Sequence, residues 1–79
     1  MNNKQKYDQV FIESFSIDKS KLTDELAYNA IRSWDSVGHM GMIAAIEETF
    51  DIMMETDDII DFSSYKKGFE IIAKYGVEF

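Results

Sequence analysis

The sequence predicts an all-α protein, a small four-helix bundle with three main helices, one short helix and a long loop between the first two. Three observations predict this fold class. Apolar residues recur three and four positions apart in several stretches, which is the spacing of one helix face. Residues that favour helix N-caps precede these stretches. Proline is absent from the 79 residues, so no position forbids a helix.

Residues 1–79 are expected to form one domain, whose small core must be filled by large side chains. Six Phe, four Tyr, one Trp and five Met are available for it. A chain of this size has no room for a deep catalytic cleft as well as a core, so we expect a protein that is not an enzyme. No apolar run approaches the ~20 residues that span a bilayer, and no apolar signal segment follows the polar start. The absence of cysteine fits a cytoplasmic location.

The first helix is expected over Lys4–Phe15, followed by a long loop over Ser16–Trp34. The apolar face of this helix consists of Tyr7, Val10, Phe11 and Ser14, with Phe15 at its edge. The loop is rich in turn-forming residues, and a connection of this length is usually functional or ordered by its own contacts. We expect it to include a short helical turn and to be anchored by Ile17, Leu22, Leu26, Tyr28 and Ile31.

The second helix is expected over Ser36–Phe50. Asp35 can accept a backbone N–H bond as its N-cap, and Trp34 can pack before it as an apolar staple. The core stripe of this helix consists of His39, Met42, Ile43, Ile46 and Phe50.

The opposite face of the second helix is apolar or bare in its first turns and acidic in its last. It consists of Val37, Met40, Gly41, Ala44, Glu47, Glu48 and Asp51. Exposed apolar residues rimmed by carboxylates indicate a docking surface for partner proteins; alternatively, one or two of them pack under the long loop. Gly38 and Gly41 each cost the helix up to ~1 kcal/mol relative to alanine. They either allow another surface to approach closely or are tolerated because packing holds the helix.

Two shorter helices complete the predicted bundle. Thr56 is expected to cap a third helix that ends near Asp61. Its apolar residues Ile59, Ile60 and Phe62 are expected to face inward or toward the end of the second helix. Ser63 or Ser64 should cap the fourth helix, which Gly76 ends. The core stripe of the fourth helix consists of Tyr65, Gly68, Phe69 and Ile72.

The net charge of −7 argues against a nucleic-acid partner, because phosphates would be repelled. Eight acidic residues and no Lys or Arg lie between Asp35 and Phe62. These carboxylates form either a solubilising face or an electrostatic docking surface for basic partners. No metal site is predicted, because Met53 and Thr56 stand where an EF-hand loop beginning at Asp51 needs an oxygen ligand and a glycine.

Ser36 falls in the first turn of the second helix, where free backbone N–H groups and the helix dipole favour a phosphate. Its hydroxyl is therefore a chemically sensible attachment point for a phosphodiester. His39 lies three residues later on the core stripe. A serine hydrolase would also need a group that orients this histidine and an oxyanion site, and neither is evident. We therefore interpret His39 as a histidine at the edge of the core.

The sequence resembles the acyl carrier protein family. The likeness rests on Asp35-Ser36-Val37 at the start of the second helix and on Ala45-Ile46-Glu47-Glu48-Thr49-Phe50-Asp51-Ile52 at its end. It covers about Tyr7 to Ile72, and the spacing to the fourth helix matches without a gap. The segment Trp34–His39 is similar to stand-alone carriers of specialised pathways, such as surface-sugar or secondary-metabolite assembly.

The resemblance implies that Ser36, preceded by Asp35, carries a covalent 4′-phosphopantetheine attached by a phosphopantetheinyl transferase. The thiol of this arm would hold an acyl or aminoacyl group as a thioester. The monomeric protein would present that group to loading and transferring enzymes that dock on the second helix. The family usually has acidic residues at the positions of Gly38 and Gly41, which points away from the enzymes of bulk fatty-acid synthesis. The alternative function is an interaction module or structural subunit of the same fold that is never modified.

Overall fold

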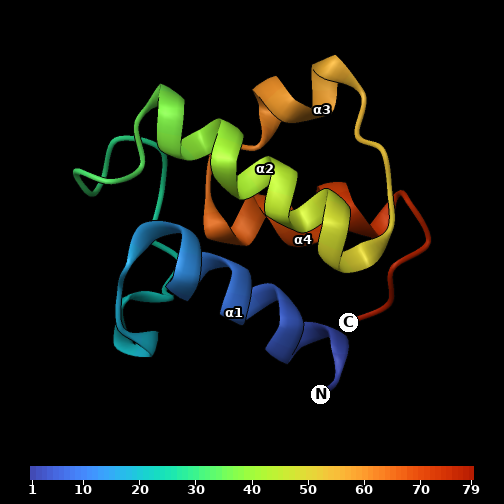
Figure 1. Ribbon diagram of the computed structural model, residues 1–79, viewed down its shortest axis with the longest axis horizontal. Coiled ribbons are helices and arrows are strands. Elements are labelled where there is room, and N and C mark those ends of the chain that lie inside the picture. The colour runs from blue at the N-terminus through green and yellow to red at the C-terminus, as the bar shows by residue number, and fades with distance from the viewer.

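The structure is a computed structural model that describes residues 1–79, and its regular elements are helices. They are α1 (Asn3–Phe15), the short 3₁₀ helix η1 (Lys19–Lys21), α2 (Ser36–Phe50), α3 (Thr56–Asp61) and α4 (Tyr65–Ala73). Figure 1 shows α2 crossing the molecule, with α1 along one side, α4 behind it and α3 at the far edge. The small helical bundle and the long connection between the first two helices are thus confirmed. None of the helices combines the length and the apolar composition needed to cross a lipid bilayer.

Side-chain caps determine where three of the helices begin. The Asn2 side chain accepts a hydrogen bond from the Gln5 backbone N–H at the start of α1. Asp35 accepts one from the Gly38 N–H at the start of α2, as predicted, with an N···O distance of 2.8 Å. Of the two serines considered for α4, Ser64 is the cap. Each cap satisfies a backbone donor that has no partner inside its helix.

Two helix ends differ from the prediction. Thr56 is not the cap of α3 but its first residue; Glu55 holds the cap position without a side-chain hydrogen bond. The helix α4 ends at Ala73, three residues before Gly76, which then adopts a positive φ of 88°. The glycine therefore turns the chain that follows the helix rather than ending the helix itself.

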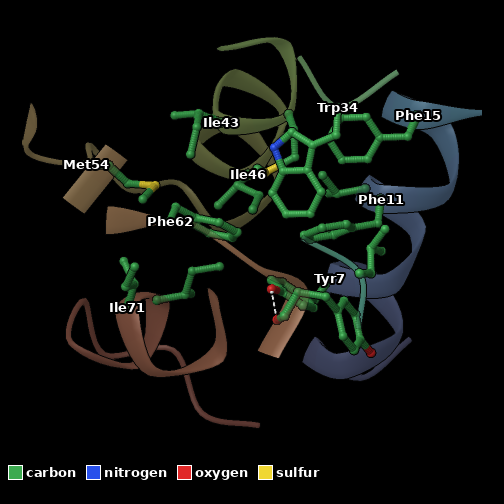
Figure 2. Close-up of a cluster of buried hydrophobic side chains, with 14 residues drawn as sticks. Tyr7, Phe11, Phe15, Trp34, Ile43, Ile46, Met54, Phe62 and Ile71 are labelled. Carbon is green, nitrogen blue, oxygen red and sulfur yellow. Dashed lines mark hydrogen bonds between the residues drawn. The ribbon is translucent and has the colours of Figure 1, made fainter. Parts of the chain in front are cut away.

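One cluster of 14 buried side chains forms the core and takes residues from α1, α2, α4 and the connections, including the residues that flank α3. Its members are Tyr7, Val10, Phe11, Phe15, Leu26, Trp34, Met42, Ile43, Ile46, Met54, Phe62, Tyr65, Ile71 and Ile72. In Figure 2 the Trp34 indole lies beside the rings of Phe11 and Phe15. Its ring centroid is 5.0 Å from that of Phe15 in a stacked arrangement and 5.5 Å from that of Phe11 in an edge-on one. Such pairs add specific geometry to the burial of apolar area.

The long loop changes two of the predicted core positions. Phe15, predicted at the edge of its helix face, belongs to the core because Trp34 from the end of the loop stacks on it. Ser14, predicted on the apolar face of the same helix, is only half-buried. Leu26 is a buried anchor, as predicted. Tyr28 is not: its side chain is 41% exposed.

Backbone hydrogen bonds join this loop to the connection between α3 and α4. An isolated antiparallel bridge pairs Ala27 with Ser64. Around it, the Tyr28 N–H donates to the Ser63 carbonyl and the Tyr65 N–H donates to the Leu26 carbonyl, both at 2.9 Å. The loop is therefore ordered by main-chain bonds as well as by its buried side chains.

Gly68 is required where the Tyr7 and Phe62 side chains pack against α4. A Cβ atom at this position would lie 2.1 Å from the Tyr7 hydroxyl oxygen and 2.3 Å from the Phe62 ring. Any side chain would push these groups apart, so this glycine of the predicted core stripe leaves room for the Tyr7 and Phe62 rings against α4.

A buried polar network joins α1 and α4. The Tyr65 hydroxyl donates to the Asp8 carboxylate at 2.6 Å, and the Lys4 ammonium lies 2.7 Å from the other carboxylate oxygen. The Tyr7 hydroxyl donates to the Tyr65 carbonyl at 2.6 Å. Burial, with the Asp8 contact, raises the pKa of Tyr65 to about 12, and the bond to Asp8 raises the pKa of Lys4. The network satisfies a carboxylate that is only 6% exposed.

We predict that Tyr65→Phe lowers the free energy of unfolding by about 1–3 kcal/mol, because it removes a donor to the buried Asp8 carboxylate. Urea denaturation at pH 7 measures this loss. In the wild type, the folded-state pKa of Tyr65 lies above its ordinary value of 10.0. Its contribution to stability is therefore complete below pH 10 and is lost as the pH rises toward 12. The variant should show a smaller loss of stability over that interval.

Tyr28→Phe is the matched control, because the Tyr28 hydroxyl is exposed and makes no hydrogen bond within the protein. It should unfold like the wild type at pH 7. Equal stability of the two variants would contradict a structural role for the bond between Tyr65 and Asp8.

Candidate functional site

Ser36 is the first residue of α2, and its side chain is exposed. No hydrogen bond from the protein engages its hydroxyl. The first backbone bond of the helix runs from the His39 N–H to the Asp35 carbonyl, and the Gly38 N–H is taken by the Asp35 carboxylate. The N–H groups of Ser36 and Val37 therefore remain free at the positive end of the helix.

Gly38 brings the end of the loop against this first turn. A Cβ atom at Gly38 would lie 2.0 Å from the Ser33 carbonyl oxygen and 3.3 Å from the Phe15 ring. The Ser33 hydroxyl in turn donates to the Phe15 carbonyl at 3.0 Å. Of the two roles considered for this glycine, close approach is the one observed, and the approaching surface is the protein's own loop.

His39 lies behind Ser36 at the edge of the core, as predicted, with 9% of its surface exposed. Its Nδ1 atom is 2.9 Å from the indole Nε1 of Trp34, and its Nε2 atom is 2.8 Å from the Ile59 carbonyl oxygen. Because an indole N–H can only donate, we assign Nδ1 as the acceptor and Nε2 as the protonated nitrogen that donates to Ile59. The imidazole thus joins the residue before the helix cap to α3.

The same hydrogen bonds leave the imidazole without a free nitrogen toward Ser36. A histidine that activates a serine needs an acceptor nitrogen within reach of the hydroxyl. In His39 that nitrogen is held by Trp34, and the other donates to Ile59. The geometry therefore gives His39 a positioning role rather than that of a general base.

An open cavity of about 370 Å³ lies next to Ser36, between the loop, α2 and α3. It is mostly apolar and is lined by Tyr28, Ser36, His39, Met40, Ile59, Ile60, Phe62 and Ser63. The Tyr28 ring stands edge-on to the His39 imidazole, with their centroids 5.7 Å apart. The loop residue that is not a core anchor thus forms a wall of this cavity.

The position of Ile60 differs from the prediction. Its side chain is 71% exposed rather than turned inward, and it lies at the rim of the cavity. On α3 the inward positions are taken by Asp58, 9% exposed, and by Phe62 just after the helix. A residue two positions from each of them points to the other side of a helix. The apolar pair Ile59-Ile60 did not predict the exposure of Ile60, because the sequence does not reveal that the nearby polar residue Asp58 is buried.

Asp58 holds α3 against the end of α4. Its two carboxylate oxygens contact the Lys74 ammonium and the Tyr75 hydroxyl. These two donors hold the pKa of Asp58 below its usual value, and the same contact raises the pKa of Lys74. Because the folded-state pKa of Asp58 is depressed, its stabilising effect is complete above the ordinary value of 3.8 and is lost as the pH falls below 3.8 through the lower folded-state pKa.

The outer face of α2 is exposed as predicted, apart from Glu47. Val37 is 80% exposed and Met40 is 54% exposed. The rest of the predicted docking positions are exposed too, namely Gly41, Ala44 and Glu48, together with Asp51. Glu47 is half-buried, and its carboxylate accepts a hydrogen bond from the Met54 N–H at 2.8 Å. Glu47 therefore orders the connection to α3. The acidic pattern of the sequence did not predict this structural role.

The eight carboxylates between Asp35 and Phe62 divide into two groups. Three of them serve the fold: Asp35 as a cap, Glu47 as an acceptor and Asp58 in the contact to α4. The others are exposed and make no ion pair, namely Glu48, Asp51, Glu55, Asp57 and Asp61. An excess of negative charge without ion-pair partners therefore extends from the end of α2 to α3.

We predict that the hydrogen bond between Trp34 and His39 is measurable as a coupling energy. Trp34→Phe and His39→Phe should each destabilise the protein, because each leaves at least one buried polar group unpaired. The double variant should be less destabilised than the sum of the two, with a coupling of about 0.5–3 kcal/mol. Urea unfolding of the four proteins completes the cycle. Additive effects would show that the two side chains only pack together.

Comparisons with known protein families, with curated proteins and with solved structures find no match for this chain. The chemistry of the site therefore rests on its own residues. These are an exposed serine at a helix N-terminus, an adjoining apolar cavity and an acidic, partly apolar surface.

Proposed function

We propose that this protein is a carrier of the acyl carrier protein kind, with 4′-phosphopantetheine attached to Ser36. The single observation that carries the proposal is the exposed, unbonded hydroxyl at the first residue of α2, beside two free backbone N–H groups. A phosphodiester there would meet the positive end of the helix and would have open space around it. The thiol of the attached arm would hold an acyl or aminoacyl group as a thioester.

The residues around Ser36 fit this task because they hold it still without covering it. Asp35 stops the first turn from fraying through its bond to the Gly38 N–H. Behind the serine, Trp34 and His39 are buried and joined to each other. An attachment point on such a rigid turn presents the serine to an enzyme in one orientation, which lowers the entropy cost of forming the complex.

The cavity next to Ser36 supports a role in sheltering cargo. Its lining carries no Asp, Glu, Lys or Arg side chain, and both ring nitrogens of His39 are already hydrogen-bonded. A chain with an apolar body would bury its surface there without leaving a protein charge unpaired. The open side of the cavity leaves a route by which cargo would enter and leave.

Docking by partner enzymes is proposed on the outer face of α2. Val37, Met40 and Ala44 offer apolar area beside Ser36, and Glu48 and Asp51 add negative charge at the other end of the helix. Proteins with basic surfaces would be steered to this face before the apolar contacts form. In this role the protein works in the cytoplasm as a monomer and catalyses nothing itself.

We predict that a broad-specificity phosphopantetheinyl transferase with coenzyme A adds one phosphopantetheine to the wild-type protein, seen by intact mass. Ser36→Ala should gain nothing. Ser63→Ala is the matched control, because Ser63 is also exposed and lines the same cavity, and it should be modified like the wild type. A folded wild-type protein that gains no mass would favour the second candidate, an interaction module that is never modified.

We predict that Glu48→Lys slows this modification several-fold, because it reverses one of the uncompensated charges near the docking face. The effect should shrink as salt is added, since screening weakens interactions between exposed charges. Glu13→Lys makes the same charge change at an exposed position of α1 and should leave the rate near that of the wild type. Rates are followed by mass spectrometry at two salt concentrations. Equal slowing by both substitutions would place docking elsewhere.

A further inference from the structure

The hydrogen bond between Trp34 and His39 requires a neutral imidazole. The indole Nε1 of Trp34 lies 2.9 Å from Nδ1 of His39 and can only donate, so Nδ1 must accept. An imidazolium ion has a proton on both ring nitrogens and can accept no hydrogen bond. Protonation of Nδ1 would therefore bring two N–H donors face to face. The bond to the Ile59 carbonyl is different, because Nε2 donates to it in either charge state.

The Trp34 indole has no other acceptor, whereas the imidazole has a route to water. The indole is fully buried against Phe11 and Phe15, and its N–H makes no hydrogen bond except the one to His39. His39 lines the open cavity next to Ser36. Because a charge is costly to bury without water or a partner, a protonated ring is expected to turn toward this cavity. The buried indole N–H would then be left unpaired, at a cost in free energy.

The side chains around His39 stay uncharged over the interval in which a histidine changes its charge, about pH 5 to 8. The rings of Trp34, Tyr28 and Phe62 face the imidazole from the loop and from the end of α3. Of these only Tyr28 is titratable, and a phenol is neutral throughout this interval.

The charged groups of the adjoining elements keep their charge in the same interval, because carboxylates are mostly ionised above about pH 5. Asp35 is the carboxylate that caps α2. On α3, Asp58 contacts Lys74 and Tyr75. This contact holds the pKa of Asp58 below its usual value of 3.8 and raises the pKa of Lys74. The other carboxylates of α3 are exposed, namely Asp57 and Asp61.

We propose that His39 is a pH-sensitive link between the end of the long loop and the first turn of α2. A proton from the solvent adds to the Nδ1 lone pair, and the indole N–H of Trp34 loses its acceptor. Because the Asp35 cap directly follows Trp34 in the chain, the turn that begins with Ser36 loosens in acidic solution and is ordered at neutral pH. This behaviour belongs to the turn itself and does not depend on what Ser36 carries.

The other attachment of the loop involves no titratable group. The Tyr28 N–H donates to the Ser63 carbonyl and the Tyr65 N–H donates to the Leu26 carbonyl, both at 2.9 Å. Backbone amides keep the same protonation state from acidic to neutral pH, so these bonds should persist. The loosening is therefore expected at the end of the loop and not at its bridge to the connection before α4.

The test is an NMR titration of the wild-type protein from about pH 8 to pH 5. The chain contains one Trp and one His, so each ring gives a single set of signals. The ¹⁵N shifts of the imidazole report its tautomer and its charge, and hydrogen exchange of the indole N–H reports its hydrogen bond. We expect the proton on Nε2 at neutral pH. Protection of the indole N–H, measured against free indole at the same pH, should fall about tenfold or more as the ring becomes charged.

Two backbone groups locate the effect in the chain. The Gly38 N–H, which the Asp35 carboxylate holds, should lose protection with the same midpoint as the indole N–H. The Tyr65 N–H, which belongs to the bridge of the loop, should keep its protection.

Two variants separate the link from other effects of acid. His39→Gln offers an amide in place of the imidazole and cannot be charged in this interval, so its indole N–H should show no transition. Tyr28→Phe leaves both bonded side chains in place and should titrate like the wild type. Circular dichroism checks the fold of each variant. An unfolded His39→Gln protein would leave the wild-type titration to decide by itself.

Four results would overturn the inference. The imidazole becomes charged while the indole N–H keeps its protection, or Nδ1 already carries the proton at neutral pH, or the ring stays neutral down to about pH 5. In the fourth, the transition persists in His39→Gln, which assigns it to another group. Because no measurement here uses a phosphopantetheinyl transferase, each outcome is independent of the modification proposed for Ser36.

Discussion

The hydrogen bond from the Trp34 indole to His39 links the end of the long loop to the first turn of α2 and, through the same imidazole, to α3. The indole is fully buried against Phe15, so its N–H must find an acceptor inside the protein. Nδ1 of His39 is that acceptor, which leaves Nε2–H to donate to the Ile59 carbonyl. Loop, α2 and α3 are thereby joined through one imidazole. Because this linkage lies behind Ser36, it holds the serine at the surface.

The two sides of α2 differ in packing: the inner side is buried in the core and the outer side is exposed. The inner side is filled with aromatic and branched side chains, and Gly38 lets the loop approach to contact distance. The outer side has few contacts with the rest of the protein, and its residues are small, apolar or acidic. The proposed carrier role would use both properties, since a rigid base would position the attachment point and an unobstructed face would let enzymes approach it. Gly41 lies on the unobstructed outer side of α2, whereas Gly38 lies on the packed inner side.

Most of the fold and part of the site could be predicted from the sequence. The bounds of α2, its cap at Asp35 and its core stripe follow from local spacing and capping rules, and the structure agrees with them except at Phe50, which is only half-buried. The predictions were wrong where a residue distant in the sequence determines whether a side chain is buried. Ile60 is exposed because Asp58 beside it is drawn inward by Lys74 and Tyr75. Glu47 was predicted to lie on the acidic docking face, but its carboxylate accepts a hydrogen bond from the Met54 N–H.

The sequence by itself determined the helices and the place of Ser36 in the first turn of α2, because caps, helical periodicity and the lack of proline act between residues a few positions apart. Only the tertiary structure decided that Asp8 is buried, that Tyr28 forms a wall of the cavity and that His39 donates to α3. These features depend on hydrogen bonds between segments far apart in the chain. A buried polar atom must be paired, but local pattern does not identify the distant group that pairs with it.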